Sequence, residues 1–256
     1  DAVANLIKEA PQELTGECNV WKNYADFPVE NYKKQKGVDM LFFRLTLVPI
    51  QEGKMGDAIS YAEEKVDEFM EVPGLLQVAL CENSDGQLMS WSTWLTEDSM
   101  NASSERLAEA LGGLKDFAAG PPEISFGKMT AGQQYVNIMK GEREGQSFVV
   151  RIGYGAEYIE EKYDEGMDWL QNTVYAGYEG TEGLLGAFAV DIGGKSITVS
   201  NWDSQEALDA SAESFQKIMA DAQNYIKSPP TIVTGECSIW RNMASFPAGK
   251  LSEWSK

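Results

Sequence analysis

Two segments near opposite ends of this chain have almost the same sequence. Residues 15–28 read TGECNVWKNYADFP and residues 234–247 read TGECSIWRNMASFP, so that nine of the fourteen positions are identical. A weaker match joins the rest of the chain: FFRL at 42–45 corresponds to VVRI at 149–152, and Trp94 corresponds to Trp202, 108 residues later. A fixed period of this kind predicts that one structural unit occurs twice.

Each copy is predicted to contain a strand, a helix, two strands, a helix and a last strand. β-branched and apolar runs mark the strands, and apolar residues three or four positions apart mark the helices. In the first copy these elements are expected at 40–48, from about 56 to 70, 75–81, 87–95, from about 107 to 119, and 124–129. In the second copy they are expected at 148–153, 159–174, 184–192, 195–202, 207–226 and 231–240.

The expected fold is therefore α+β, with two βαββαβ repeats that close into one intramolecular, pseudo-dimeric barrel of antiparallel sheets. Helices cover one face of each sheet, and the other face must be covered by the partner sheet. The predicted boundaries are 1–37 for an N-terminal extension with an extra strand, 38–129 and 146–240 for the repeats, 130–145 for the linker and 241–256 for the C-terminal tail. We expect the extra strand, at 15–28, to lie beside its relative at 234–247.

The composition excludes several classes of function. The chain has no histidine, which rules out Ser-His-Asp and Cys-His catalysis and removes the commonest metal ligand. The net charge of −19 disfavours binding to nucleic acid, because the phosphate backbone would be repelled. The three cysteines form no CxxC pair, so we expect no metal site.

Other features bear on the compartment and the oligomeric state. No apolar run approaches the ~20 residues that span a bilayer, so we expect a soluble protein. The chain begins at Asp1 rather than Met, which predicts a processed N-terminus and leaves an organelle, a lumen or secretion open. Cys18 and Cys237 occupy matching positions, either as a disulfide or as two buried thiols. An intramolecular barrel predicts a monomer, with a protein partner as the alternative.

Strand alternation assigns candidate binding residues to one face of each sheet. We expect Met89 and Trp91 to face the helices and the polar and aromatic residues that alternate with them to face the partner sheet. Polar groups between two sheets are costly unless they are paired or hydrated, so this pattern predicts a partly polar inter-sheet cavity. Alternatively, the arginines form ion pairs at the rim and the tryptophans plug the barrel. The expected lining residues are Arg44, Gln77, Ser92, Trp94, Arg151, Phe188, Ser200 and Trp202.

Several short motifs resemble the antibiotic biosynthesis monooxygenase-like (ABM) dimeric α+β barrel superfamily. They are WDS at 202–204, QEAL at 205–208 opening a helix, PP at 229–230 before a Gly-Glu strand, and FRLTL at 43–47. The resemblance covers both copies and implies ferredoxin-like half-barrels, which normally homodimerise, fused here in tandem. It places the strand-end tryptophan of the family at Trp94 and Trp202. Haem-degrading members use a helix histidine and a first-strand asparagine, which this chain lacks: Phe43 and Val150 occupy the strand positions.

Two hypotheses for function follow. The first is binding of a small aromatic or hydrophobic molecule in the inter-sheet cavity, as in a cofactor-independent monooxygenase of this superfamily. In that hypothesis Arg44 and Arg151 stabilise an anionic substrate and Trp94 and Trp202 position it by stacking, while no residue is singled out as the catalytic base. The alternative is a non-catalytic ligand-binding or assembly subunit of a larger complex, which would dock through the WxNxxxFP tails that begin at Trp21 and Trp240.

Overall fold

The computed structural model describes residues 41–69, 72–142 and 146–251 of the chain. The predicted extra strand at 15–28 and Cys18 lie outside these residues. The first half consists of β1 (Phe42–Pro49), α1 (Met55–Val66), η3 (Asp67–Phe69), β2 (Leu75–Glu82), β3 (Gln87–Trp94), α2 (Glu97–Ala102), α3 (Ser104–Ala110), η4 (Gly112–Asp116) and β4 (Glu123–Gln134).

The second half repeats this order. It consists of β5 (Phe148–Tyr158), η5 (Glu160–Lys162), α4 (Tyr163–Trp169), η6 (Leu170–Tyr175), β6 (Leu184–Asp191), β7 (Lys195–Trp202), α5 (Gln205–Ala210), α6 (Ala212–Ala222), β8 (Ile226–Ser228), β9 (Thr231–Cys237), β10 (Ile239–Asn242) and β11 (Gly249–Lys250). The predicted α+β fold of two βαββαβ repeats with antiparallel sheets is confirmed.

Two strand segments join the halves into a closed ring. The first part of β4 pairs with β1, and its second part pairs with β6 of the other half. In the same way β9 pairs with β5, and β10, which follows it directly, pairs with β2 of the first half. β4 therefore continues to Gln134, into the segment expected to be the linker. The strands close around a shared centre, as expected for an intramolecular barrel.

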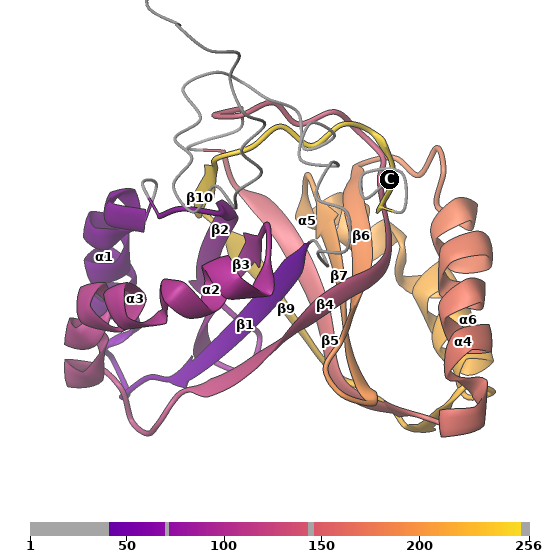
Figure 1. Cartoon of the computed structure of the whole chain (residues 1–256), viewed down its shortest axis with the longest axis horizontal. Coiled ribbons are helices and arrows are strands. Elements are labelled where there is room, and N and C mark those ends of the chain that lie inside the picture. The colour runs from indigo at the N-terminus through magenta and orange to yellow at the C-terminus, as the bar shows by residue number, and fades with distance from the viewer. Residues whose placement is uncertain (1–40, 70–71, 143–145, 252–256) are drawn as a thin grey trace, which may run out of the picture.

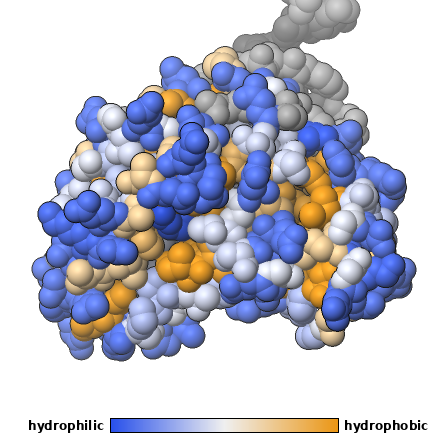
Figure 2. Space-filling model, turned by 180° about the vertical axis from the view of Figure 1, so that it is seen from behind, coloured by the Kyte–Doolittle hydropathy of each residue, from blue (hydrophilic) through white to orange (hydrophobic). Residues whose placement is uncertain are grey.

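The helices form two outer layers on opposite sides of the strands. In Figure 1, α1, α2 and α3 lie on one side of the sheet, and α4 and α6 lie on the other. Seen from behind, most of the visible surface is hydrophilic, as the strong negative charge predicts (Figure 2). None of the helices within the described residues combines the length and the apolar character needed to cross a bilayer.

The two sheet faces are the reverse of those expected. The buried cluster shared by both halves contains Phe43, Trp91, Val150 and Val199, so these residues fill the centre of the barrel. Arg44, Trp94, Arg151 and Trp202 alternate with them and face the helices. The physical reason is that a sheet-on-sheet interface is dry and takes the large apolar side chains, whereas polar side chains under the helices find hydrogen-bond partners on the helix ends.

Candidate functional site

An arginine in the first strand of each half binds the C-terminal end of a short helix. The Arg151 Nη2 atom donates to the Leu208 carbonyl oxygen, at 3.3 Å, and to Ser211 Oγ, at 3.1 Å, where α5 ends. Arg44 does the same at the end of α2, at 2.9 Å from Ser104 Oγ and 3.5 Å from the Met100 carbonyl oxygen. The last carbonyls of a helix have no intrahelical partner, so a buried cation is well placed to satisfy them.

The strand-end tryptophans lie beside these arginines. Trp94 and Trp202 are fully buried, and each indole donates from Nε1 to the serine two positions earlier, at 2.8 and 3.0 Å. The Arg151 guanidinium lies 5.9 Å from the centre of the Trp202 ring and only 4.1 Å from the centre of the Phe215 ring on α6. Burial lowers the pKa of the Arg151 guanidinium, but not enough to remove its charge.

A cavity of about 90 Å³ adjoins Arg151, between the second sheet and its own helices. Its floor is formed by outward-facing residues of β5 and β7, among them Ser196, Thr198 and Ser200. Ile218 and Met219 of α6 cover it, and Ile232 of β9 closes one side. Six aromatic side chains also line it: Tyr158, Trp169, Tyr175, Tyr178, Phe215 and Tyr225. The expected cavity between the two sheets is thus replaced by one between sheet and helices.

Substitutions between the repeats account for this space. Leu88, six residues before Trp94, is buried against the helices of the first half, whereas Ser196 stands six residues before Trp202. Leu80 lies opposite Ser90 in the first sheet, and Ala189 occupies the corresponding place opposite Thr198 in the second. The first half therefore fills this layer with leucine side chains, and the second half has small or polar ones.

A π-helical segment, η6, forms another wall of the cavity. A π-turn has i→i+5 hydrogen bonds, which span one more residue than those of an α-helix; it is rare and is frequent at functional sites. η6 is tied to β4 and to the residue that follows it: the Gly132 N–H donates to Gln171 Oε1 at 2.9 Å, and the Tyr135 hydroxyl donates to the Tyr175 carbonyl oxygen at 2.8 Å. Leu170, Val174 and Tyr175 of η6 line the cavity.

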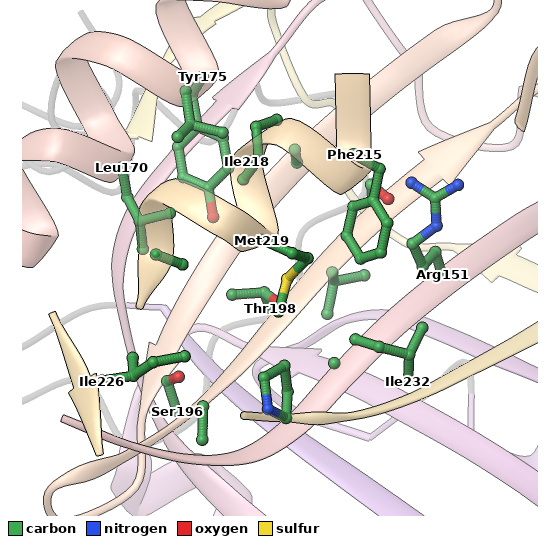
Figure 3. A pocket seen from close by; sticks show the side chains of 18 of the residues that line it. Arg151, Leu170, Tyr175, Ser196, Thr198, Phe215, Ile218, Met219, Ile226 and Ile232 are labelled. Atoms are coloured by element: carbon green, nitrogen blue, oxygen red, sulfur yellow. The ribbon is translucent and has the colours of Figure 1, made fainter. Parts of the chain in front are cut away.

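The Tyr175 hydroxyl group is the most unusual polar group of the site. The side chain is 4% exposed, and its oxygen has no hydrogen-bond partner. In Figure 3 this hydroxyl points towards the space between Leu170 and Met219, while Arg151 lies at the other end beside Phe215. Burial raises the pKa of the Tyr175 phenol well above its usual value, so the group stays neutral and can donate a hydrogen bond. A buried hydroxyl without a partner costs about 1–3 kcal/mol, which a ligand that accepts this hydrogen bond would recover.

The site offers little for metal binding or acid–base catalysis. No aspartate, glutamate or histidine occurs among the residues that line the cavity. In the part of the chain that the structure describes, no cluster of three or more cysteine and acidic side chains could hold a metal ion. The groups available for chemistry are the Arg151 cation, phenolic hydroxyls and three strand hydroxyls.

Three solved structures share this architecture. A candidate monooxygenase from Lactobacillus acidophilus NCFM matches with a TM-score of 0.63 at 10% identity, over 81% of this chain and 99% of its own. A candidate monooxygenase from Fusobacterium nucleatum subsp. nucleatum ATCC 25586 matches with a TM-score of 0.63 at 13% identity, over 82% of this chain and 99% of its own. An anthrone oxidase-like protein matches with a TM-score of 0.58 at 14% identity, over 81% of this chain and 94% of its own.

The chain shares the α+β barrel fold of these three structures. At this level of identity the likeness concerns the fold alone. No protein-family profile matches the sequence, and no curated protein matches it.

The barrel separates the predicted binding residues into three groups. Arg151 and Ser200 line the cavity, with Trp202 packed beside Arg151. Arg44, Ser92 and Trp94 hold the corresponding places in the first half. Phe188 packs against Phe43 in the centre of the barrel, with ring centres 5.2 Å apart, and Gln77 pairs with Thr93 on the neighbouring strand.

Sequence reasoning missed the residues that the helices contribute, chiefly Tyr175 and Phe215. Phe215 belongs to an ordinary amphipathic helix pattern, Tyr175 stands directly after the helix expected at 159–174, and no local motif marks a π-turn. A signal was present in the comparison of the repeats, where Leu80 and Leu88 correspond to Ala189 and Ser196.

Proposed function

We propose that the second half of the barrel binds a small, largely aromatic or hydrophobic molecule in the cavity between its sheet and its helices. The observation that carries this proposal is the buried, unpartnered Tyr175 hydroxyl aimed into an aromatic-walled space that ends at a buried arginine. An apolar pocket with a few convergent polar groups is the usual form of a small-molecule site. The ligand would accept a hydrogen bond from Tyr175 and carry an electron-rich or anionic group towards Arg151.

The size of the cavity limits the ligand. Drug-sized ligands occupy pockets of roughly 300–1,000 Å³, and an engineered cavity of about 150 Å³ binds benzene. A space of about 90 Å³ therefore fits a single small ring at most while α6 keeps its position. A larger ligand requires α6 to move outward, and none of its residues is fully buried.

Cofactor-independent oxygenation is the second candidate, favoured by the buried Arg151 cation beside an aromatic-lined cavity. In such a reaction an anthrone-type CH₂ group becomes a carbonyl group: one atom of O₂ enters the product, the other leaves as water, and the substrate supplies all four electrons. Arg151 would stabilise the negative charge of the deprotonated substrate. Because no carboxylate or histidine lines the cavity, the proton would have to leave to solvent or through a hydroxyl group.

Calorimetric titration with phenol, which has a single ring, tests binding. We expect one saturable site in the natural chain and at least a tenfold loss of affinity in Ser196→Leu, which restores the first-half side chain and fills the space. Tyr175→Phe should weaken phenol binding while leaving the fold intact. The matched control is Ser90→Leu in the first half, which should leave affinity unchanged. Equal affinity in the natural chain and in Ser196→Leu would contradict the proposal.

Oxygen uptake with anthrone separates the two candidates. An oxygenase consumes one O₂ per anthraquinone formed, at a rate that Arg151→Ala lowers and Arg44→Ala does not. If uptake equals the uncatalysed rate while phenols still bind, the site is a binding site only.

A further inference from the structure

The ring closes at two places that are built in the same way. At the first, β4 passes from β1 to β6, and there Met129 lies opposite Val190. At the second, the chain passes from β5 to β2 through β9 and β10. Because the two halves repeat each other, each residue of the first closure has a counterpart at the second.

The counterparts of Met129 and Val190 are both cysteines. Cys81 pairs with Met89 in the first sheet as Val190 pairs with Ile197 in the second, so Cys81 is the counterpart of Val190. Cys237 ends β9 and stands 108 residues after Met129, which is the spacing of the repeat. The second closure therefore has two thiols where the first has an ordinary apolar pair.

The two sulfur atoms meet beside Gly235. A Cβ atom at Gly235 would lie 2.6 Å from Cys81 Sγ. Cys237 follows two residues later, on the same face of β9, and its Sγ atom lies 3.9 Å from the Gly235 carbonyl oxygen. The two thiols are hydrogen-bonded to each other. Thr234 anchors this part of β9, because its carbonyl oxygen accepts from the Ser84 N–H at 2.7 Å.

This contact identifies a partner for Cys237 that the sequence did not suggest. The repeated TGEC motif pointed to Cys18, whereas the structure shows Cys81 beside Cys237. Both are free thiols, 2% and 0% exposed, in the core cluster that the two halves share. A disulfide between them would join the first half to the second across the closure.

A groove at the surface leads to this pair. It lies between the β2–β3 turn and β9, and Cys81 and Gly235 are among the residues that line it. Glu82 and Glu236, both exposed, also line it, so that a neutral oxidant enters more easily than an anionic one. Cys81 is thus the thiol that an oxidant reaches first. Burial raises the pKa of the Cys237 thiol well above its usual value, which keeps Cys237 protonated until Cys81 has reacted.

We propose that Cys81 and Cys237 are a dithiol–disulfide pair that locks the closed ring when a small neutral peroxide oxidises it. The peroxide transfers one oxygen atom to the Cys81 sulfur, which gives a sulfenic acid and one water. The Cys237 sulfur then attacks the Cys81 sulfur, so that the S–S bond forms and the S–O bond breaks. The leaving hydroxide takes the Cys237 proton and becomes a second water. The two thiols lose two electrons, and the peroxide gains them.

The disulfide stabilises the ring by restricting the unfolded chain. It encloses the chain from β3 to β9, which includes nearly all of the second half, in one covalent loop, and long loops lose the most freedom on cross-linking. We expect oxidation to raise the urea concentration at the midpoint of unfolding by about 1 M. Dithiothreitol should return the midpoint to its value in the reduced chain.

The test uses the full-length Cys18→Ser chain, in which Cys81 and Cys237 are the two remaining thiols. After treatment with hydrogen peroxide, titration with Ellman's reagent in urea should find no free thiol. Mass spectrometry of unreduced peptides should find Cys81 linked to Cys237 within one chain. The matched control is Cys18→Ser/Cys237→Ser, whose urea midpoint hydrogen peroxide should not raise.

Two results overturn the proposal in these chains. The first is oxidation of Cys81 to a sulfinic acid while Cys237 stays free, and the second is a Cys81–Cys237 disulfide that leaves the urea midpoint unchanged. The natural chain provides a measurement that needs no substitution: there too hydrogen peroxide should link Cys81 to Cys237. A disulfide from Cys18 to either of them would show that the pairing is wrong.

Discussion

Arg44 and Arg151 show how one side chain can serve structure in one half and a site in the other. Both donate to the end of a short helix, and Arg151 also lines the cavity. Charge-assisted hydrogen bonds to buried carbonyls contribute about 1.5–3 kcal/mol. Replacing either arginine with alanine should therefore lower the free energy of unfolding in urea by a similar amount, on the order of 2 kcal/mol.

Ligand binding should separate the two variants. Arg151→Ala is expected to weaken the affinity for phenols at least tenfold, and Arg44→Ala should leave it unchanged, both measured by calorimetry. A loss of affinity in both variants would mean that Arg151 acts through the general stability of the fold.

The raised pKa of the Tyr158 phenol should make the free energy of unfolding fall in alkaline solution. Burial raises the pKa of this phenol to about 12, against 10.0 in the unfolded chain. Between these two values the unfolded state loses its proton first, so the folded state binds more protons and stability falls as the pH rises. By pH 11 the loss from this one group is on the order of 1 kcal/mol.

The measurement compares urea unfolding at pH 9 and pH 11 in the natural chain and in Tyr158→Phe. The variant should lose less stability over this interval, by about the amount assigned to Tyr158. An equal loss in both chains would show that other groups, such as the buried Tyr175, account for the alkaline sensitivity.

The residues of the site also show what strand alternation can and cannot establish. Alternation correctly grouped Arg151, Ser200 and Trp202 on one face, because neighbouring side chains on a strand point in opposite directions. It could not say which face meets the helices, since both faces carry large apolar residues. Trp91 and Trp94 are both fully buried, one in the barrel centre and one beneath a helix. The hydrogen bonds that make the arginines acceptable under the helices involve residues far away in the sequence.

At the scale of elements, α6 differs from α1 in how firmly it is held. α1 has three fully buried residues, Ala58, Ala62 and Val66, whereas α6 has none and instead lies over the cavity with Phe215, Ile218 and Met219 half-buried. A helix with little buried surface opens at low free-energy cost. Backbone amides of α6 should thus exchange with deuterium faster than those of α1.

Amide exchange in α6 and in α1 should then be compared with and without a saturating concentration of phenol. Because the ligand would bind beneath α6, exchange in α6 should slow at least severalfold, and exchange in α1 should not change. Protection that appears equally in both helices would indicate general stabilisation rather than binding beneath α6.

The elements themselves were largely predictable, and their irregularities were not. The strands and helices follow apolar periodicity and turn residues such as Gly86 and Gly193, both at positive φ. The π-turn at Leu170–Tyr175 is held by two contacts that only the tertiary structure brings together, one from Gln171 to β4 and one from Tyr135, the residue after β4. The extension of β4 to Gln134 likewise depends on its second partner, β6, because the polar residues there gave no strand signal.

At the scale of the whole molecule, the closed ring makes each half depend on the other. β4 and the β9–β10 connection each pair with strands of both halves, so neither sheet is complete on its own. The repeat made this arrangement predictable from the sequence, because two similar units with one exposed sheet face each have a matching partner in the same chain. A ring of this kind should unfold as one cooperative unit, with no state in which one half is folded alone.

Leu88→Ala tests this cooperativity at a buried residue of the first half. Leu88 is 1% exposed and packs in the cluster between the first sheet and its helices. The cavity left by the substitution should cost about 2–5 kcal/mol. In a single cooperative unit, the slowest-exchanging amides of β6 and β7 in the second half must lose as much protection as those of β1 and β3. If only the first half becomes less protected, the halves fold independently, and the barrel is two domains in contact rather than one ring.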